Sequence, residues 1–155
     1  MLRWTFALAA VGWALALPLA TWTAGSSGLF SLAYAAAVAI YGIGAWVCHQ
    51  RPDRSFYLWA TQMPVCARCT GIYLGGALAA IASSVAARRR RANTPFISWS
   101  SARWRVAFAI AALPTLATLL AEWTGSTAPS NAVRAIAGLP IGAVVVRAVL
   151  RAEVN

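Results

Sequence analysis

The stretch PVCARCTGIYLGGALAAIASSVAARRRR, residues 64–91, decides the fold of this chain. From Val65 to Ala87 it is apolar except for Arg68 and a few small polar side chains, and it ends in the unbroken run Arg88–Arg91. An apolar segment of roughly 20 residues is long enough to cross the hydrocarbon core of a bilayer as a helix. Arginines clustered at one end of such a segment favour the cytoplasmic side. The stretch therefore predicts a transmembrane helix that ends in the cytoplasm.

The composition of the whole chain agrees with a lipid environment. Of its 155 residues, 61% are hydrophobic and 10% are charged, whereas a soluble domain carries about 25% charged residues. The net charge of +10 comes from arginine alone, because the sequence contains no lysine. A nucleic-acid-binding protein can be equally basic, but it does not need several apolar segments. We therefore expect one membrane domain over residues 1–155, with membrane lipids and no nucleic acid as partners.

Five apolar stretches approach membrane-spanning length, and small polar or Pro-containing turns separate them. This pattern predicts an all-α fold, an integral membrane bundle of about five transmembrane helices. The pairs Gly71/Gly75 and Gly138/Gly142 would let helices approach closely, although glycine is frequent enough here for chance spacing. The five expected spans are Trp4–Trp22, Leu29–Val47, Val65–Ala87, Val106–Trp123 and Ala132–Leu150.

The distribution of arginines predicts how these spans are oriented. With five crossings, the run Arg88–Arg91 and the later arginines Arg103, Arg105, Arg147 and Arg151 share the cytoplasmic side. We therefore expect a multi-pass protein of the cell membrane with its N-terminus outside and its C-terminus in the cytoplasm. A cleaved signal peptide is the alternative for the first span, but that span is longer than a usual signal core. The outer side would carry Arg3, Arg51, Arg54, Arg68 and Arg134.

All three cysteines and the single histidine fall between the second and third spans. Cys66 and Cys69 form a C-x-x-C pair at the start of a predicted helix, and Cys48 and His49 end the preceding one. A helical hairpin would bring these four side chains to one face of the membrane. Zinc takes four Cys or His ligands, and iron also accepts thiolates, so we expect a zinc or iron site. Since adjacent residues rarely ligate one ion together, His49 is either the fourth ligand or a proton carrier.

Two other readings of the cysteines stay open. A helix N-terminus and the neighbouring Arg68 lower the pKa of a thiol, which suits a quinone-linked thiol–disulfide oxidoreductase. Such an enzyme normally needs a second cysteine pair, and Cys48 alone is one residue short. The third reading is a non-catalytic membrane assembly protein in which the cysteines only staple two helices together.

Polar residues near the cysteines indicate a bound anionic group. Arg51, Arg54 and Arg134 could bind a phosphate or carboxylate of a lipid-borne substrate, with Asn131 beside Arg134 at a helix start. For a single arginine, the simpler explanation is a solvated charge in a loop. Glu122 is a plausible counter-charge for Arg134, and both Glu122 and His49 are candidates for general acid–base catalysis.

At these residues the chain resembles a family of small bacterial and archaeal multi-pass membrane proteins, domain of unknown function 2085. The resemblance rests on CHQRPDRSF at residues 48–56 and PVCARCTGIY at 64–73, with a looser match over 131–142, and covers roughly residues 40 to 145. Many such proteins carry an Asp-Gly pair where this chain has EWTG at 122–125. The resemblance implies a multi-pass helical protein in which the Cys/His segment, Asn131 and Arg134 form one site, and it supplies no activity.

Overall fold

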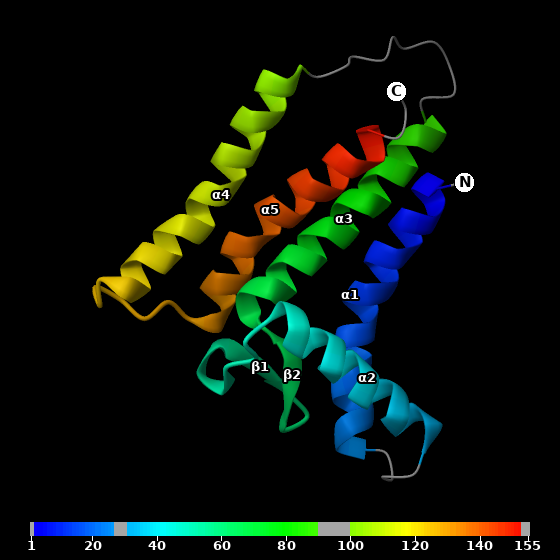
Figure 1. The fold of residues 1–155 in the computed structure, drawn as a ribbon, viewed down its shortest axis with the longest axis vertical. Helices are drawn as coiled ribbons and strands as arrows, with labels where there is room; N and C mark the ends of the chain where they lie inside the picture. Colours follow the sequence, from blue (N-terminus) through cyan, green and yellow to red (C-terminus); the bar gives the residue numbers. More distant parts are fainter. Residues whose placement is uncertain (1, 27–30, 90–99, 153–155) are drawn as a thin grey trace.

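The computed structural model describes residues 2–26, 31–89 and 100–152. Five α-helices make up most of this part of the chain, which confirms the expected helical bundle (Figure 1). A short 3-10 turn and a two-stranded hairpin separate the second helix from the third. The elements are α1 (Leu2–Ser26), α2 (Leu32–Val47), η1 (Pro52–Arg54), β1 (Ser55–Leu58), β2 (Thr61–Cys66), α3 (Ala67–Arg89), α4 (Ser101–Trp123) and α5 (Asn131–Ala152).

Four of these helices, α1, α3, α4 and α5, are long and apolar enough to cross a membrane. The fifth, α2, has 16 residues. At about 1.5 Å per residue it reaches roughly 24 Å, less than the roughly 30 Å of a bilayer core. It lies across the lower half of α1 rather than along the bundle (Figure 1). Leu29 and Phe30, at the start of the expected second span, lie outside the described residues.

The short α2 changes the expected path of the chain. Because α2 stays at the end of the bundle where α1 finishes, α3 starts from that same end (Figure 1). The beginning of α1 and the end of α5 then lie together at the opposite end. The sequence counted this stretch as a crossing and therefore expected the two chain ends on opposite sides of the membrane. The orientation of the chain ends stays a prediction.

The tightest contact in the bundle joins α3 to α5, which run side by side (Figure 1). Gly71 and Gly75 of α3 face the backbone of Ala135 and Leu139, so a Cβ at either glycine would overlap backbone atoms of α5. Gly138 and Gly142 of α5 face the backbone of α3 in the same way. Small residues spaced four apart are what allows helix backbones to meet closely in lipid. The expected close approach is therefore confirmed, and both glycine pairs take part in it.

The hairpin β1–β2 was not predicted from the sequence. Leu58 pairs with Thr61, so Trp59 and Ala60 form a two-residue turn with φ angles of 50° and 61°. Two successive positive φ values are typical of a type I′ turn, which normally carries Asn and Gly. The chain lacks that signal, and a segment read as a loop is in fact an ordered sheet. At its open end, Ser55 pairs with Cys66.

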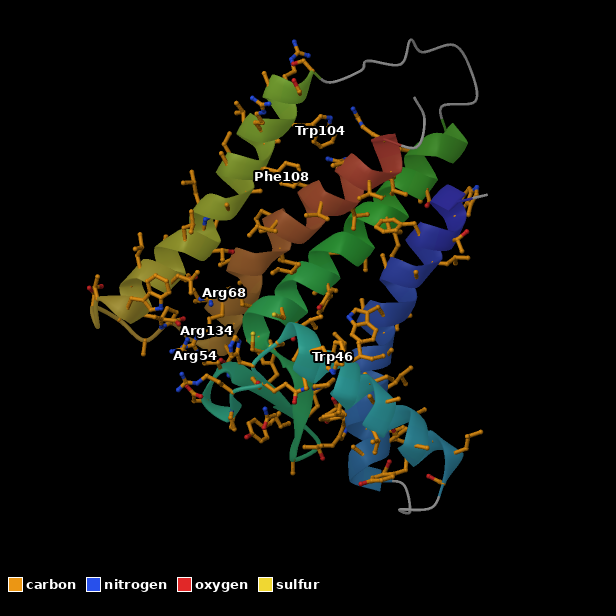
Figure 2. All side chains as sticks on the ribbon, in the orientation of Figure 1. Trp46, Arg54, Arg68, Trp104, Phe108 and Arg134 are labelled. Atoms are coloured by element: carbon orange, nitrogen blue, oxygen red, sulfur yellow. The ribbon has the colours of Figure 1, made fainter. Side chains whose placement is uncertain are left out.

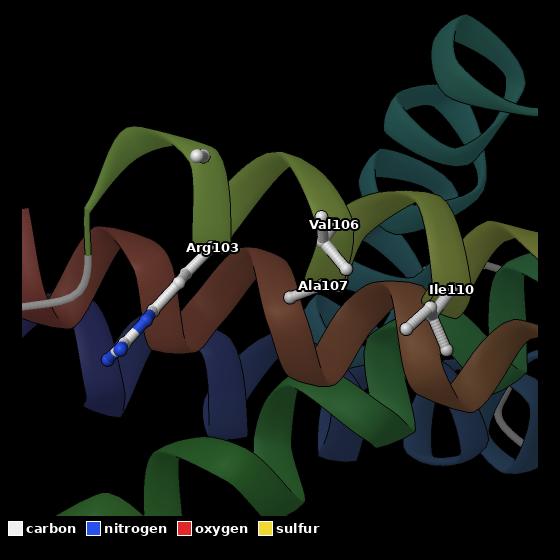
Figure 3. A pocket seen from close by; sticks show the side chains of 5 residues that line it. Arg103, Val106, Ala107 and Ile110 are labelled. Atoms are coloured by element: carbon white, nitrogen blue, oxygen red, sulfur yellow. The ribbon is translucent and has the colours of Figure 1, made fainter.

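The outermost helix, α4, contacts chiefly α5. Trp104 and Phe108 point from α4 toward α5 (Figure 2), and the Thr115 hydroxyl donates a hydrogen bond of 2.8 Å to the Ala137 carbonyl. A groove of about 410 Å³ runs along the first half of α4, lined by four apolar or small side chains and Arg103 (Figure 3). It lies at the far end of the bundle from the cysteines.

Candidate functional site

The three cysteines meet at one point, as the sequence predicted. Cys48 directly follows α2, Cys66 is the last residue of β2, and Cys69 lies in the first turn of α3. Their three sulfur atoms all lie within 4.8 Å of one another. We call this group the cysteine cluster. It packs in an apolar cluster that includes Leu17 of α1 and Val65 of β2.

The surroundings of Cys66 within the cysteine cluster favour its thiolate form. The backbone N–H of Cys66 donates a hydrogen bond of 3.1 Å to Sγ of Cys48. Hydrogen bonding by the Cys69 thiol, despite burial, lowers the pKa of Cys66 to about 5. A thiolate, rather than a thiol, is both the metal ligand and the nucleophile. Cys66 therefore offers its sulfur in the reactive form at neutral pH.

Three thiolates so arranged can hold one soft metal ion. Zinc binds sulfur at about 2.3 Å and prefers four tetrahedral ligands, so three cysteines would leave one position for another ligand. His49 does not fill it in this structure, because its side chain is exposed and is not part of the cluster. Cys48 has extended backbone angles (φ −147°, ψ 140°). Successive side chains of an extended chain point to opposite sides, so a buried Cys48 directs His49 outward.

Two glutamine side chains fix the loop that carries Cys48. Gln50 has a positive φ of 46°, and its Nε2 donates to the carbonyls of Tyr41 (2.9 Å) and Pro64 (2.7 Å). Nε2 of Gln62 donates to the carbonyl of Gln50 at 2.7 Å. These amides tie α2 and its following loop to β2 and so hold Cys48 against Cys66. Sequence analysis gave them no role, and the hint available was that Gln50 lies inside the CHQRPDRSF motif at residues 48–56.

A second cluster lies on the other side of the start of α3. Three guanidinium groups surround the carboxylate of Glu122, near the beginnings of α3 and α5 (Figure 2). Oε1 accepts from Nε of Arg134 at 2.8 Å and from Nη2 of Arg68 at 3.1 Å. Nη1 of Arg54 lies 2.9 Å from Oε2, an ion pair whose angles are outside the range of a hydrogen bond. We call Arg54, Arg68, Arg134 and Glu122 the arginine–glutamate cluster.

Residues 48–147 match the family described as "Predicted membrane protein (DUF2085)". The chain belongs to this family. The matched range contains every residue of both clusters. The family description and the four long apolar helices together make this a membrane protein.

Two curated relatives share short segments with this DUF2085 chain. An uncharacterized protein of Methanocaldococcus jannaschii is 47% identical over 38 residues, which is 24% of either chain. An uncharacterized protein of Methanothermobacter thermautotrophicus is 53% identical over 30 residues, 19% of this chain and 27% of the relative. The chain thus matches about a quarter of the length of these relatives. No solved structure matches it significantly.

Among the residues expected to bind an anion, the structure brings Arg54 and Arg134 together and leaves Arg51 apart. Arg51 is exposed and pairs with Asp53 at 3.3 Å. The expected pairing of Glu122 with Arg134 is confirmed, and Arg134 is buried in the bundle rather than turned to the surface.

Asn131 and Arg68 have roles that differ from those the sequence suggested. Both ends of the Asn131 amide are occupied: Oδ1 accepts from Arg134 at 2.9 Å, and Nδ2 donates to the carbonyl of Ser55 at 2.8 Å. Asn131 thus joins α5 to the hairpin and positions Arg134. Arg68 was considered only for its effect on the thiols, yet it reaches Glu122 and Thr118 of α4. The available signal was the position of Arg68 in the first turn of an apolar helix. The next helix carries one acid, Glu122, near its end.

Proposed function

We propose that this protein binds one transition-metal ion, zinc or iron, through Cys48, Cys66 and Cys69, and that it binds an anionic, lipid-borne group beside that ion. The observation that carries the proposal is the convergence of three sulfurs from two separate segments, with a backbone N–H donated to one of them. In this proposal His49 is the fourth ligand or a proton carrier, and Glu122 keeps its candidate role in acid–base chemistry. A bound ion of this kind polarises an oxygen or activates water.

We further propose that both clusters face the extracytoplasmic side. Four arginines belong to the end of the bundle that carries the clusters: Arg51, Arg54, Arg68 and Arg134. The other arginines of the described ranges lie in α1, α3, α4 and α5 toward the other end, and Arg90 and Arg91 directly follow α3 in the sequence. The positive-inside rule then favours a cytoplasmic location for that arginine-rich end and for both chain ends. Cysteine accessibility to a membrane-impermeant reagent in intact cells tests this orientation.

Metal content tests the proposed ion site. The full chain, purified without chelators, is analysed for zinc and iron beside Cys66→Ser and His49→Ala, with Tyr57→Phe on the exposed part of the hairpin as the matched control. We expect about one ion per wild-type and control chain, as one mononuclear site requires, and almost none in Cys66→Ser. His49→Ala shows whether the histidine is a ligand. Absence of stoichiometric zinc or iron from wild type and Cys66→Ser alike contradicts the proposal.

The low pKa of Cys66 favours one further candidate, a quinone-linked thiol–disulfide oxidoreductase. The Cys66 thiolate would attack a substrate disulfide and release one substrate thiolate, and Cys69 would then displace the second. Two electrons thus reduce the substrate and leave a Cys66–Cys69 disulfide. In the reverse direction a substrate dithiol is oxidised as it reduces that disulfide, and a quinone then takes two electrons and two protons from the Cys66–Cys69 dithiol to restore it. Trapping a mixed disulfide in Cys69→Ser supports this candidate, and inertness toward alkylation counts against it.

A further inference from the structure

The arginine–glutamate cluster holds more positive than negative charge. Three guanidinium groups face one carboxylate, whose side chain is 4% exposed. The only other acid among the described residues is Asp53, which is 57% exposed and already lies between Arg51 and Arg54. Glu153, the remaining acid of the sequence, lies outside the described residues. Inside the cluster, two positive charges are therefore not balanced by Glu122.

Excess charge in such a place is costly. Arg68 and Arg134 have side chains only 14% and 10% exposed, at the ends of helices that cross the membrane. Removing charges from water without pairing them costs several kcal/mol per ion. Charged residues near the membrane therefore pair with one another or with a ligand. This cluster is only partly paired within the chain.

The cluster also has hydrogen-bond donors left over. Nε of Arg68 is buried and has no hydrogen-bond partner, and the buried Nε of Arg54 has only an ion pair of 3.4 Å with Oδ2 of Asp53. A guanidinium group presents its donors in a planar fork that fits two oxygens of a phosphate. Side-chain exposure falls from 30% at Arg54 to 14% at Arg68 and 10% at Arg134. Arg54 therefore forms the rim, and the other two arginines form the inner wall.

We propose that the arginine–glutamate cluster is a binding site for a phosphate group that carries two negative charges. Glu122 is the internal anion that holds the three arginines together in the absence of the ligand, and Asn131 positions Arg134. A dianion balances the two remaining charges, whereas a carboxylate leaves one of them unpaired. The inference rests on the anionic ligand in the proposed function and not on the metal ion.

The experiment measures thermal unfolding of the purified full chain while sodium phosphate is added, with sodium chloride at equal ionic strength as the salt control. The pH is kept alkaline so that the dianion dominates, because inorganic phosphate loses its second proton at a higher pH than a phosphate monoester, whose second pKa is about 6. We expect phosphate, and not chloride, to raise the midpoint of the wild type. Glu122→Gln removes the competing negative charge, so its half-saturating phosphate concentration should fall at least about tenfold. Arg54→Gln should raise that concentration at least about tenfold.

The matched control is Arg105→Gln, which removes the same charge from an exposed position at the other end of the bundle and should respond as the wild type does. An ion cluster with a purely structural role predicts that Glu122→Gln is destabilised and that phosphate does not restore it. Absence of a phosphate effect in both wild type and Glu122→Gln overturns the proposal. Equal half-saturating phosphate concentrations in wild type and Arg54→Gln also overturn the proposal. This comparison remains decisive if Glu122→Gln does not fold.

The lipid composition of nanodiscs distinguishes a phosphate that belongs to a lipid headgroup from a phosphate free in solution. Nanodiscs of phosphatidylcholine are compared with nanodiscs that also contain phosphatidic acid, each with and without inorganic phosphate. Stabilisation by phosphatidic acid indicates a lipid headgroup, and stabilisation by inorganic phosphate alone indicates a soluble ligand; either result supports the site. Cys66→Ser should keep the phosphate response, so loss of the metal proposal and loss of this one are distinguishable.

Discussion

The cysteine cluster and the arginine–glutamate cluster lie on two sides of the same helix turn, yet they are built in opposite ways. The first gathers soft sulfur atoms among apolar side chains of α1, α2 and the hairpin. The second gathers hard charges from α3, α4, α5 and the 3-10 turn. Neighbouring residues on a helix point about 100° apart, because 3.6 residues make a turn. Cys69 and Arg68 can therefore be adjacent in sequence and serve different sites.

The comparison teaches that contiguity in a motif does not mean one site. The hairpin is the physical link, since Ser55 pairs with Cys66 and its carbonyl accepts from Asn131. One small sheet thus holds a cysteine on one side and supports Arg134 on the other. We therefore expect each cluster to be removable by substitution without loss of the other.

The largest expected effect is a complete separation of two binding properties. Cys48→Ser should abolish metal binding, because a hydroxyl is a poor substitute for a thiolate, and should leave the phosphate response intact. Arg54→Gln should leave metal binding intact and raise the half-saturating phosphate concentration at least about tenfold. Metal analysis and phosphate-dependent unfolding on the same two preparations check both halves. If either substitution removed both properties, the two clusters would be one site.

The second largest effect is expected on the stability of the arginine–glutamate cluster. Glu122→Ala leaves three arginines without their shared partner, and we expect the free energy of unfolding in phosphate-free buffer to fall by about 3–5 kcal/mol. Thr118→Ala removes a neutral acceptor of Arg68 and the hydrogen bond that its hydroxyl donates to the Thr115 carbonyl, so it should cost about 1 kcal/mol. Denaturant unfolding followed by tryptophan fluorescence compares the two. Equal losses would mean that Glu122 does not hold the cluster together.

The sequence predicted the parts of this molecule that depend on length and composition. Long apolar stretches identified four helices that can cross the membrane, and the confinement of all three cysteines to one segment identified the cysteine cluster. The sequence overestimated the length of α2, because apolar composition does not reveal that this helix has only 16 residues. It missed the hairpin, because Trp59 and Ala60 are unusual residues for a turn with positive φ values.

Side-chain direction explains the remaining differences at the site. His49 is next to Cys48 in sequence, but the extended backbone at Cys48 separates their side chains. Arg68 is next to Cys69, but helix geometry directs it to Glu122. Spacing alone gives the distance between residues along the chain and not the side to which each one points.

A smaller effect is expected from pH on the thiolate of the cysteine cluster and on the stability that it contributes. The pKa of Cys66 is lowered from 9.0 to about 5 in the folded protein. Its thiolate therefore contributes stability above the unfolded pKa, and that contribution declines as the pH falls from about 9 and is lost below about 5. Thiolate absorbance of the metal-free protein should report a transition near pH 5 in wild type, and that transition should be absent from Cys66→Ser. A transition near pH 9 instead would contradict the hydrogen-bonded thiolate.

The smallest effect tests whether the hairpin only supports the two clusters. Ala60→Gly places glycine at a φ of 61°, where an L side chain is disfavoured, so the free energy of unfolding should rise by about 0.5–1 kcal/mol. The matched control is Ala36→Gly on the exposed face of α2, where the same change should lower it by about 0.5–1 kcal/mol. Metal content and half-saturating phosphate should stay unchanged in both variants. If relieving the turn altered either binding property, the strained turn itself would set the geometry of that cluster, and the two sides of the α3 turn would be coupled through the sheet between them.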